Sequence, residues 1–283
     1  MSASTPIKRV KAGVIGWPIG HSRSPLIHNY WMEQYQIDAT YGLCPIDPST
    51  DFRAALTALA ADGYIGANVT LPHKENAFRA MDALSPMAEK LGAVNTISFE
   101  NGQMIGSNTD VGGFIASLDA HGTRWRDTPA LVLGAGGAAR AIIAALDAED
   151  VPEVRLVNRT RDRAEALAAL APTCIKIGEW QARGALAAEC GLLINTTSLG
   201  MTGGAALEMP LDALADGAMV SDIVYTPLET DLVMRARAEG YVAIDGLGML
   251  MQQAALSFES WFGIAPIIDS GLRDNLIADL QEG

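Results

Sequence analysis

The sequence predicts an α/β protein of two domains, and three observations support this fold class. The chain has 283 residues, which is longer than one typical domain. Short apolar runs flanked by glycine, proline or polar residues recur along it, as expected for strands buried in parallel sheets. Longer alanine- and leucine-rich stretches, which favour helix, separate these runs. We expect an N-terminal α/β domain, a Rossmann-type doubly wound parallel sheet, and C-terminal helices that pack back on the first domain.

The N-terminal elements begin with a strand at Val10–Ile15, which a glycine- and proline-rich loop follows. Ser24 is expected to cap a helix whose first residue is Pro25 and which runs to about Tyr35. Ser22 and Ser24 could offer hydroxyl groups to a small polar ligand, although Ser24 could equally be a plain helix cap. A second strand at 41–46 and a helix at 51–61 come next.

A third strand ends in a cluster of polar residues, and a turn and a helix follow it. Asn68, Thr70 and Lys74 lie within a few residues of one another at the carboxyl end of this strand, where open α/β sheets bind their ligands. Segments 92–96 and 106–110 repeat the pattern of apolar residues followed by Asn-Thr. Asp110 precedes a helix, so it could be a functional carboxylate or a helix cap.

The second domain is organised around a strand, a glycine-rich turn and a helix. Ala130–Leu133 is a continuous apolar run, and the helix-forming stretch 138–146 follows the turn. The amino end of such a helix carries unsatisfied N–H groups and binds anions. The turn therefore predicts a dinucleotide site, although a tight turn in any α/β protein would look similar. The residues expected to contact the cofactor here are Gly134, Ala135, Gly136, Gly137 and Ala138.

The end of the next predicted strand, 154–157, indicates which dinucleotide binds. NAD-binding sheets place an acid about 20 residues after the first glycine, whereas an arginine accommodates the 2′-phosphate of NADP. Asn158, Arg159 and Thr160 occupy this region, no acid is present, and Arg163 is close by. The sequence therefore predicts NADP as the cofactor.

The remaining apolar runs are expected to form strands at 192–195, 219–224 and 241–244, with Thr196 at the cofactor edge of the sheet. A helix from Gly246 to about Trp261 and another at about 270–281 should complete the chain. The predicted domains are residues 1–110 with 247–283, and residues 111–246.

Composition narrows the possible partners and location. The net charge of −13 argues against nucleic acid, and no apolar run has the length of a membrane span. The N-terminus lacks a signal-peptide core, so we expect a cytoplasmic protein. Cys44, Cys174 and Cys190 are isolated, which predicts neither a disulfide framework nor a metal site.

Seven motifs, taken together and in order, resemble the shikimate dehydrogenase family. They are P-I-G-H-S-R-S-P at 18–25, N-V-T-L-P-H-K at 68–74, G-A-V-N-T at 92–96, N-T-D at 108–110, G-A-G-G-A-A-R at 134–140, N-R-T at 158–160 and G-L-G-M-L-x-x-Q at 246–253. The resemblance implies a substrate domain followed by an NADP domain. It also implies reversible NADPH-dependent reduction of 3-dehydroshikimate to shikimate, in chorismate and aromatic amino-acid biosynthesis. We expect a monomer or a homodimer.

The resemblance also implies roles for individual residues. Lys74 and Asp110 would be the catalytic pair, and Ser22 and Ser24 would bind the substrate carboxylate. The other implied substrate contacts are Asn68, Thr70, Asn95, Asp110 and Gln253, with Tyr225 near the substrate. Further cofactor contacts are expected at Thr196, Ile223 and Gly246.

The chemistry of the residues agrees with this family. Hydride reduction of a ketone leaves negative charge on oxygen, which Lys74 could protonate while Asp110 orients it. No tyrosine has a lysine four places on, which counts against a short-chain dehydrogenase. Two alternatives stay open: a quinate/shikimate dehydrogenase with relaxed substrate or cofactor use, and a non-catalytic NADP-binding regulator.

Overall fold

The computed structural model describes residues 10–171 and 173–282. The chain divides into two compact units: one contains the described residues up to Thr109 together with Ala254–Leu276, and the other contains Asp110–Gln253 and the residues after Leu276. The helix α10 (Gly246–Phe262) therefore begins in the second unit and ends in the first. The predicted domains assigned residues 247–253 to the first domain, and those bounds stay a prediction.

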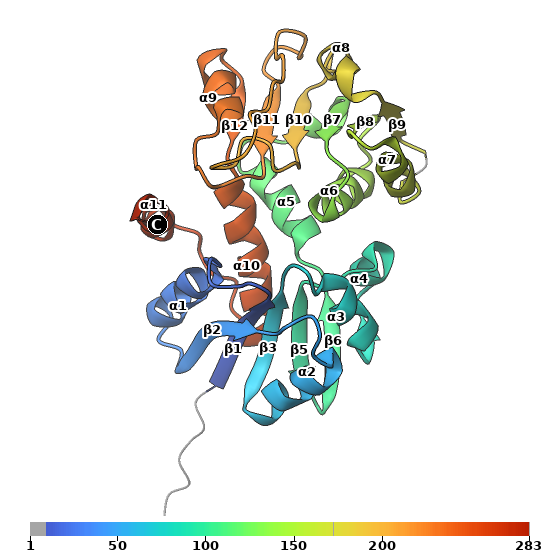
Figure 1. Cartoon of the computed structure of the whole chain (residues 1–283). Helices are drawn as coiled ribbons and strands as arrows, with labels where there is room; N and C mark the ends of the chain where they lie inside the picture. Colours follow the sequence, from blue (N-terminus) through green and yellow to red (C-terminus); the bar gives the residue numbers. More distant parts are fainter. Residues whose placement is uncertain (1–9, 172, 283) are drawn as a thin grey trace, which may run out of the picture. The chain divides into compact units, whose positions relative to one another are not determined.

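The first unit is built on a six-stranded sheet in the order β2-β1-β3-β5-β6-β4 (Figure 1). β1 pairs in parallel with β2 and β3, whereas β5 is antiparallel to both β3 and β6, so the sheet is mixed. The strands are β1 (Val10–Gly16), β2 (Ala39–Pro45), β3 (Tyr64–Val69), β4 (Ala83–Leu84), β5 (Thr96–Glu100) and β6 (Gln103–Ser107).

The β5–β6 hairpin is a feature that the sequence analysis did not predict. Its turn consists of Asn101 and Gly102, with φ angles of 50° and 79°. Two left-handed residues in succession give the tight turn that matches the twist of two antiparallel strands, and Asn-Gly is the pair that favours it. The sequence thus contains a local signal for this hairpin.

Helices cover both faces of this sheet. The helices are α1 (Ser24–Gln34), α2 (Phe52–Ala61), α3 (Lys74–Ala80) and α4 (Pro86–Leu91). On one face, side chains of α2 and α3 form a core with Ile15, Val69 and Ile97 of the strands. The later part of the chain also belongs to this unit, because the Trp31 indole N–H donates to the Ile267 carbonyl at 3.0 Å, and that of Trp261 donates to Ile97 at 3.0 Å. The predicted return of the C-terminal helices is confirmed.

The second unit contains a six-stranded parallel sheet in the order β12-β11-β10-β7-β8-β9 (Figure 1). This is the doubly wound order, in which the strand sequence reverses between β7 and β10. The strands are β7 (Ala130–Leu133), β8 (Val154–Val157), β9 (Ile175–Gly178), β10 (Leu192–Asn195), β11 (Met219–Asp222) and β12 (Val242–Ile244). The Rossmann-type sheet is therefore confirmed, although β9 was not predicted.

Its helices are α5 (Asp110–Asp119), α6 (Gly137–Ala148), α7 (Arg161–Ala168), α8 (Arg183–Leu186) and α9 (Asp231–Ala238), with 3-10 turns η1 (Arg124–Asp127) and η2 (Trp180–Ala182). The last helix of the chain, α11 (Ser270–Glu282), follows α10. Among the described residues, none of the helices is both long and apolar enough to cross a membrane.

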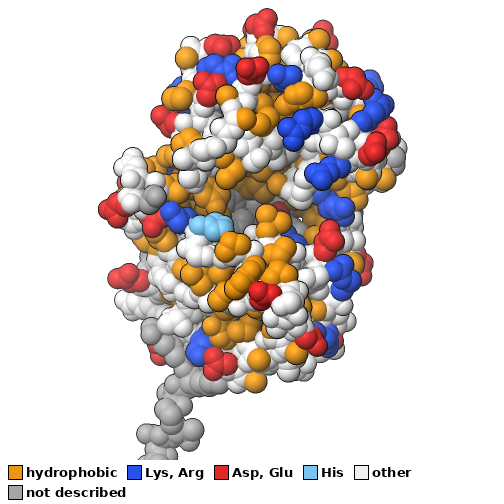
Figure 2. Space-filling model, in the orientation of Figure 1, with side chains coloured by type: hydrophobic (Ala, Val, Ile, Leu, Met, Phe, Trp, Pro, Cys, Tyr) orange, Lys and Arg blue, Asp and Glu red, His pale blue; other side chains and the backbone are white. Residues whose placement is uncertain are grey.

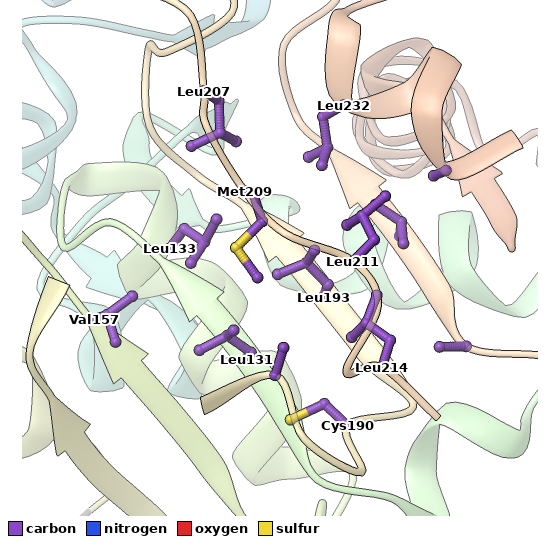
Figure 3. Close-up of a cluster of buried hydrophobic side chains, with 14 residues drawn as sticks. Leu131, Leu133, Val157, Cys190, Leu193, Leu207, Met209, Leu211, Leu214 and Leu232 are labelled. Carbon is purple, nitrogen blue, oxygen red and sulfur yellow. The ribbon is translucent and has the colours of Figure 1, made fainter. Parts of the chain in front are cut away.

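A buried apolar cluster holds the middle strands of this sheet in place. Figure 3 shows Leu131 and Leu133 of β7 and Leu193 of β10 facing Met209 and Leu211, which come from an irregular segment between β10 and β11. Each of these side chains is at most 2% exposed. Burying one such side chain contributes about 1.5 to 3 kcal/mol to the free energy of folding. The cluster therefore fixes the positions of the strands whose carboxyl ends form the site described below.

Candidate functional site

A pocket of about 460 Å³ lies at the carboxyl ends of β7, β8 and β10, where the strand order of the second unit reverses. Open α/β sheets bind nucleotides at this place. The predicted cofactor residues that line it are Gly134, Ala135, Gly136, Asn158, Arg159, Thr160, Arg163 and Thr196. The structure thus brings residues from three loops into one concave surface.

The glycine turn has the geometry that an anion site needs. Gly134 has φ of 106°, and a Cβ there would lie 2.6 Å from the Thr196 hydroxyl, so only glycine fits. A Cβ at Gly136 or Gly137 would meet no atom within 4 Å. Since α6 begins at Gly137, the open space lies beside its amino-terminal N–H groups and leaves room for a pyrophosphate.

Three arginines occur between 159 and 163, and their surroundings differ. Arg161 pairs with Glu165 at 2.8 Å and with Glu179 at 2.5 Å. Arg159 and Arg163 line the pocket, are exposed, and make no ion pair with the residues that the structure describes. The pocket lining contains neither Asp nor Glu. This arrangement suits a cofactor that carries an extra phosphate.

On the face seen in Figure 2, acidic and basic residues are interspersed.

Four predicted cofactor residues do not line this pocket. Gly137 and Ala138 begin α6, and Ile223 follows β11. Gly246 starts α10, and a Cβ there would lie 2.4 Å from the Ile223 carbonyl oxygen. Ile223 and Gly246 therefore contact each other beyond the carboxyl ends of β11 and β12.

The pocket also includes four residues that the sequence analysis did not select: Trp180, Thr197, Ser198 and Leu199. The last three follow Thr196 directly, so their position after a predicted strand was a usable signal. Trp180 follows β9, the strand that was not predicted, and no local pattern marks it.

In the first unit, two of the predicted substrate residues are buried in a polar network. Asn68, at the end of β3, accepts a hydrogen bond from the Tyr41 hydroxyl at 2.7 Å and donates to the Ser257 hydroxyl at 2.8 Å. The Asn95 amide oxygen accepts from the Thr109 N–H at 2.8 Å, and its nitrogen donates to the Thr109 hydroxyl at 3.0 Å. Both amides are thereby held in fixed orientations.

The loops that follow β1 and β3 lie side by side, because the Trp17 N–H donates to the Leu71 carbonyl at 3.1 Å and the Thr70 N–H donates to Ile15 at 2.9 Å. These loops carry Ser22 and Thr70, and Lys74 begins α3 directly after the second one. The structure thus places these polar side chains at one edge of the first sheet.

The expected helix-cap role of Ser24 is wrong. The N-cap of α1 is Arg23, Ser24 is the first helical residue, and its N–H donates to the Ser22 hydroxyl at 3.3 Å. Proline is tolerated throughout the first turn, where N–H groups lack helical partners, so the helix begins one residue earlier than predicted. Asp110 is likewise the first residue of α5 rather than a residue before it.

The second unit carries Asp110, Tyr225 and Gln253. Gly113, one turn after Asp110, lets two helices meet closely, since a Cβ there would lie 2.6 Å from the Gln253 Cβ. The Gln253 amide nitrogen donates to the Leu250 carbonyl at 2.9 Å. Gln253 therefore lies beside the first turns of α5, although 140 positions separate Gly113 from it in the sequence.

Two family profiles match the chain. The profile described as the shikimate dehydrogenase substrate binding domain matches residues 14–97, and the one described as shikimate / quinate 5-dehydrogenase matches residues 117–199. The shikimate dehydrogenase (NADP(+)) of Rhodospirillum rubrum is 49% identical over 269 residues, which cover 93% of this chain and 95% of the relative. The chain belongs to the shikimate dehydrogenase family. The family predicted from the motifs is thus confirmed.

Further members of this family support the same placement. The shikimate dehydrogenase (NADP(+)) of Acidiphilium cryptum is 50% identical over 271 residues, covering 95% of this chain and 96% of its own. The crystal structure of shikimate 5-dehydrogenase from Thermus thermophilus, in complex with NADP(H) and shikimate, has a TM-score of 0.84 and 34% identity, and covers 96% of this chain and 99% of that one. Quinate dehydrogenase from Corynebacterium glutamicum, in complex with NAD, has a TM-score of 0.89 and 27% identity, with 95% and 99% covered.

Proposed function

We propose that this chain is an NADP-dependent shikimate dehydrogenase that reversibly reduces 3-dehydroshikimate to shikimate in chorismate and aromatic amino-acid biosynthesis. One observation carries the cofactor assignment: the Rossmann pocket presents Arg159 and Arg163 without ion-pair partners among the described residues, and no acid lines it. The assignment of the reaction rests on the shikimate dehydrogenases that are 49% and 50% identical to this chain over nearly its whole length.

NADPH, when bound, supplies the hydride. Gly136 and Gly137 hold its pyrophosphate through the free N–H groups at the start of α6. Arg159, Arg163 and the Thr160 hydroxyl bind the 2′-phosphate, because guanidinium groups form two-point, charge-assisted contacts with phosphate. Asn158 and Thr196 complete the pocket walls, and the remaining predicted contacts are Ala135, Ala138, Ile223 and Gly246.

Polar side chains hold the substrate. Ser22 and Ser24 donate hydroxyl hydrogen bonds to its carboxylate. Asn68 and Asn95 contribute amides whose orientations are already fixed by Tyr41 and Thr109. Preorganised polar groups cost little reorganisation on binding. Thr70, Tyr225 and Gln253 are the other proposed contacts.

Lys74 and Asp110 perform the proton transfer. As the carbonyl oxygen gains negative charge, the Lys74 ammonium stabilises it and delivers a proton. In the reverse direction the neutral amine of Lys74 takes the proton back from the substrate hydroxyl, and Asp110 is the proposed partner that shares this proton. No metal enters this scheme, because a protonated lysine supplies the charge that the developing alkoxide needs.

The test is oxidation of shikimate and of quinate by the purified protein, each with NADP+ and with NAD+, followed by absorbance of the reduced cofactor. We expect the highest kcat/KM for shikimate with NADP+. Faster turnover of quinate with NAD+ would instead identify a quinate dehydrogenase, and NADP+ binding without turnover of either substrate would indicate a regulator. Cytoplasmic location and a monomeric or homodimeric state stay predictions.

A further inference from the structure

A buried polar network lies directly behind one wall of the cofactor pocket. The wall segment Thr196–Leu199 follows Asn195, the last residue of β10, which is fully buried. The Asn195 amide nitrogen donates to the Asp222 carboxylate at 2.9 Å and to the Leu199 carbonyl at 3.1 Å. Its amide oxygen accepts from the backbone N–H and the hydroxyl of Thr197, at 3.0 and 2.7 Å. One amide group therefore ties Thr197 and Leu199 of the wall segment to β11.

We propose that Asp222 is a positioning residue whose carboxylate sets the orientation of the Asn195 amide and thereby the shape of the Thr196–Leu199 wall. This inference rests on the proposed use of NADP at the pocket. An ionised carboxylate only accepts hydrogen bonds, so Asn195 must turn its NH2 group towards Asp222. The amide oxygen then faces the two donors of Thr197. A reversed amide would place oxygen against oxygen and would leave both Thr197 donors without an acceptor.

The carboxylate itself is held in place by two other donors. Asp222 is 1% exposed, and it accepts from the Val224 N–H at 3.1 Å and from the Thr230 hydroxyl at 2.7 Å. The pKa of this carboxyl is raised above its usual value because burial outweighs the lowering effect of its hydrogen bonds with Thr230, Val224 and Asn195. Thr230 also caps α9 by accepting from the Val233 N–H at 3.3 Å. Asp222 thus has a fixed position from which it can orient its neighbour.

The direct test is Asp222→Asn, which keeps the size of the side chain but gives it both a donor and an acceptor. Both orientations of Asn195 then become available, and the wall segment loses its single arrangement. We expect the KM for NADPH and the Kd for NADP+, measured by calorimetry, to rise roughly 5- to 100-fold, the cost of one unsatisfied buried group. The KM for shikimate should stay within about twofold, because Tyr225, which follows Val224, is the one proposed substrate residue that adjoins this network.

Two further variants separate positioning from stability. Thr230→Val removes the hydrogen bond to one carboxylate oxygen and the cap of α9. The Val224 N–H still holds the other oxygen, which faces Asn195, so this variant should lower the Tm while the KM for NADPH is unchanged. Thr197→Val leaves the buried carboxylate intact but removes the hydroxyl that joins Asn195 to the Leu199 N–H. Thr197→Val should weaken NADP+ binding. The double variant Thr197→Val/Asp222→Asn should lose less NADP+ affinity than the product of the two single fold-losses, because both substitutions act on the same network.

Unchanged NADP+ affinity in Asp222→Asn, or a Thr230→Val variant that loses as much affinity as Asp222→Asn, would overturn the proposal. If Asp222→Asn does not fold, Thr197→Val decides: normal NADP+ affinity in that variant contradicts the positioning role. NADP+ binding is measured without shikimate, so a wild-type protein that binds NADP+ and does not oxidise shikimate would refute the proposed reaction while leaving this comparison valid.

Discussion

Replacing Arg159 with alanine tests whether the pocket distinguishes NADP from NAD. The Arg159 side chain is exposed, lines the pocket, and has no ion-pair partner among the described residues that its loss would leave unpaired. The substitution should therefore act on the cofactor rather than on the fold. Arg161→Ala is the matched control, because Arg161 lies two residues away and is engaged by Glu165 and Glu179.

The expected magnitude follows from the contact that is lost. A hydrogen bond to a charged group contributes about 1.5 to 3 kcal/mol, and every 1.4 kcal/mol is a tenfold change in affinity. Salt screens an exposed site, and Arg163 stays in place, so the lower part of this range applies. We expect the KM for NADPH to rise about 10- to 30-fold in Arg159→Ala. NADH lacks the 2′-phosphate, and its KM should change little.

The assay is the ratio of kcat/KM for NADPH to that for NADH, with 3-dehydroshikimate as substrate, in the wild type, Arg159→Ala and Arg161→Ala. This ratio should fall strongly in Arg159→Ala and stay close to the wild-type value in Arg161→Ala. Raising the ionic strength should increase the KM for NADPH in the wild type more than in Arg159→Ala, since the screened contact is missing from the variant. Equal losses with both cofactors, or equal effects of the two substitutions, would refute the assignment of Arg159 to the 2′-phosphate.

Three other predictions follow from the site and the core. Lys74→Met should lower kcat by about 10²- to 10⁴-fold with little change in shikimate binding. Adding Asp110→Asn to this variant should lower kcat much less than Asp110→Asn does in the wild type, because the two residues act as a unit. A near-normal kcat in Lys74→Met would exclude Lys74 as the proton donor. Ser22→Ala and Ser24→Ala should raise the KM for shikimate and leave the cofactor KM unchanged; unaltered kinetics would remove both from the carboxylate site. Burial lowers the pKa of His28 to about 3, below its unfolded value of about 6.5. Stability is thus fully present above pH 6.5 and falls by about 1.4 kcal/mol per unit towards pH 3, because only the unfolded histidine takes up the proton. Urea midpoints of His28→Phe should lack this part of the pH dependence, and an identical profile in wild type and variant would contradict it.

The sequence by itself determined the features that depend on local chemistry. The apolar run Ala130–Leu133 predicted β7 with its observed bounds, because four consecutive apolar residues suit a strand buried on both faces. Gly134 was predicted to occupy a turn, and its positive φ and its contact with Thr196 require glycine. The absence of an acid at 158–160, where the predicted strand ends, predicted a pocket that favours NADP. Each of these signals lies within a few residues of the position that it describes.

Only the tertiary structure decided which distant residues act together. Nothing near Ser257 indicates that its hydroxyl meets Asn68, since 189 positions separate them. Glu179 lies 18 positions from Arg161, and only the fold brings these two side chains into an ion pair. The contact between Asp222 and Asn195 likewise arises because β10 and β11 are neighbours in register. Strand order and packing bring such groups within hydrogen-bond distance, and neither propensity nor spacing along the chain specifies these long-range contacts.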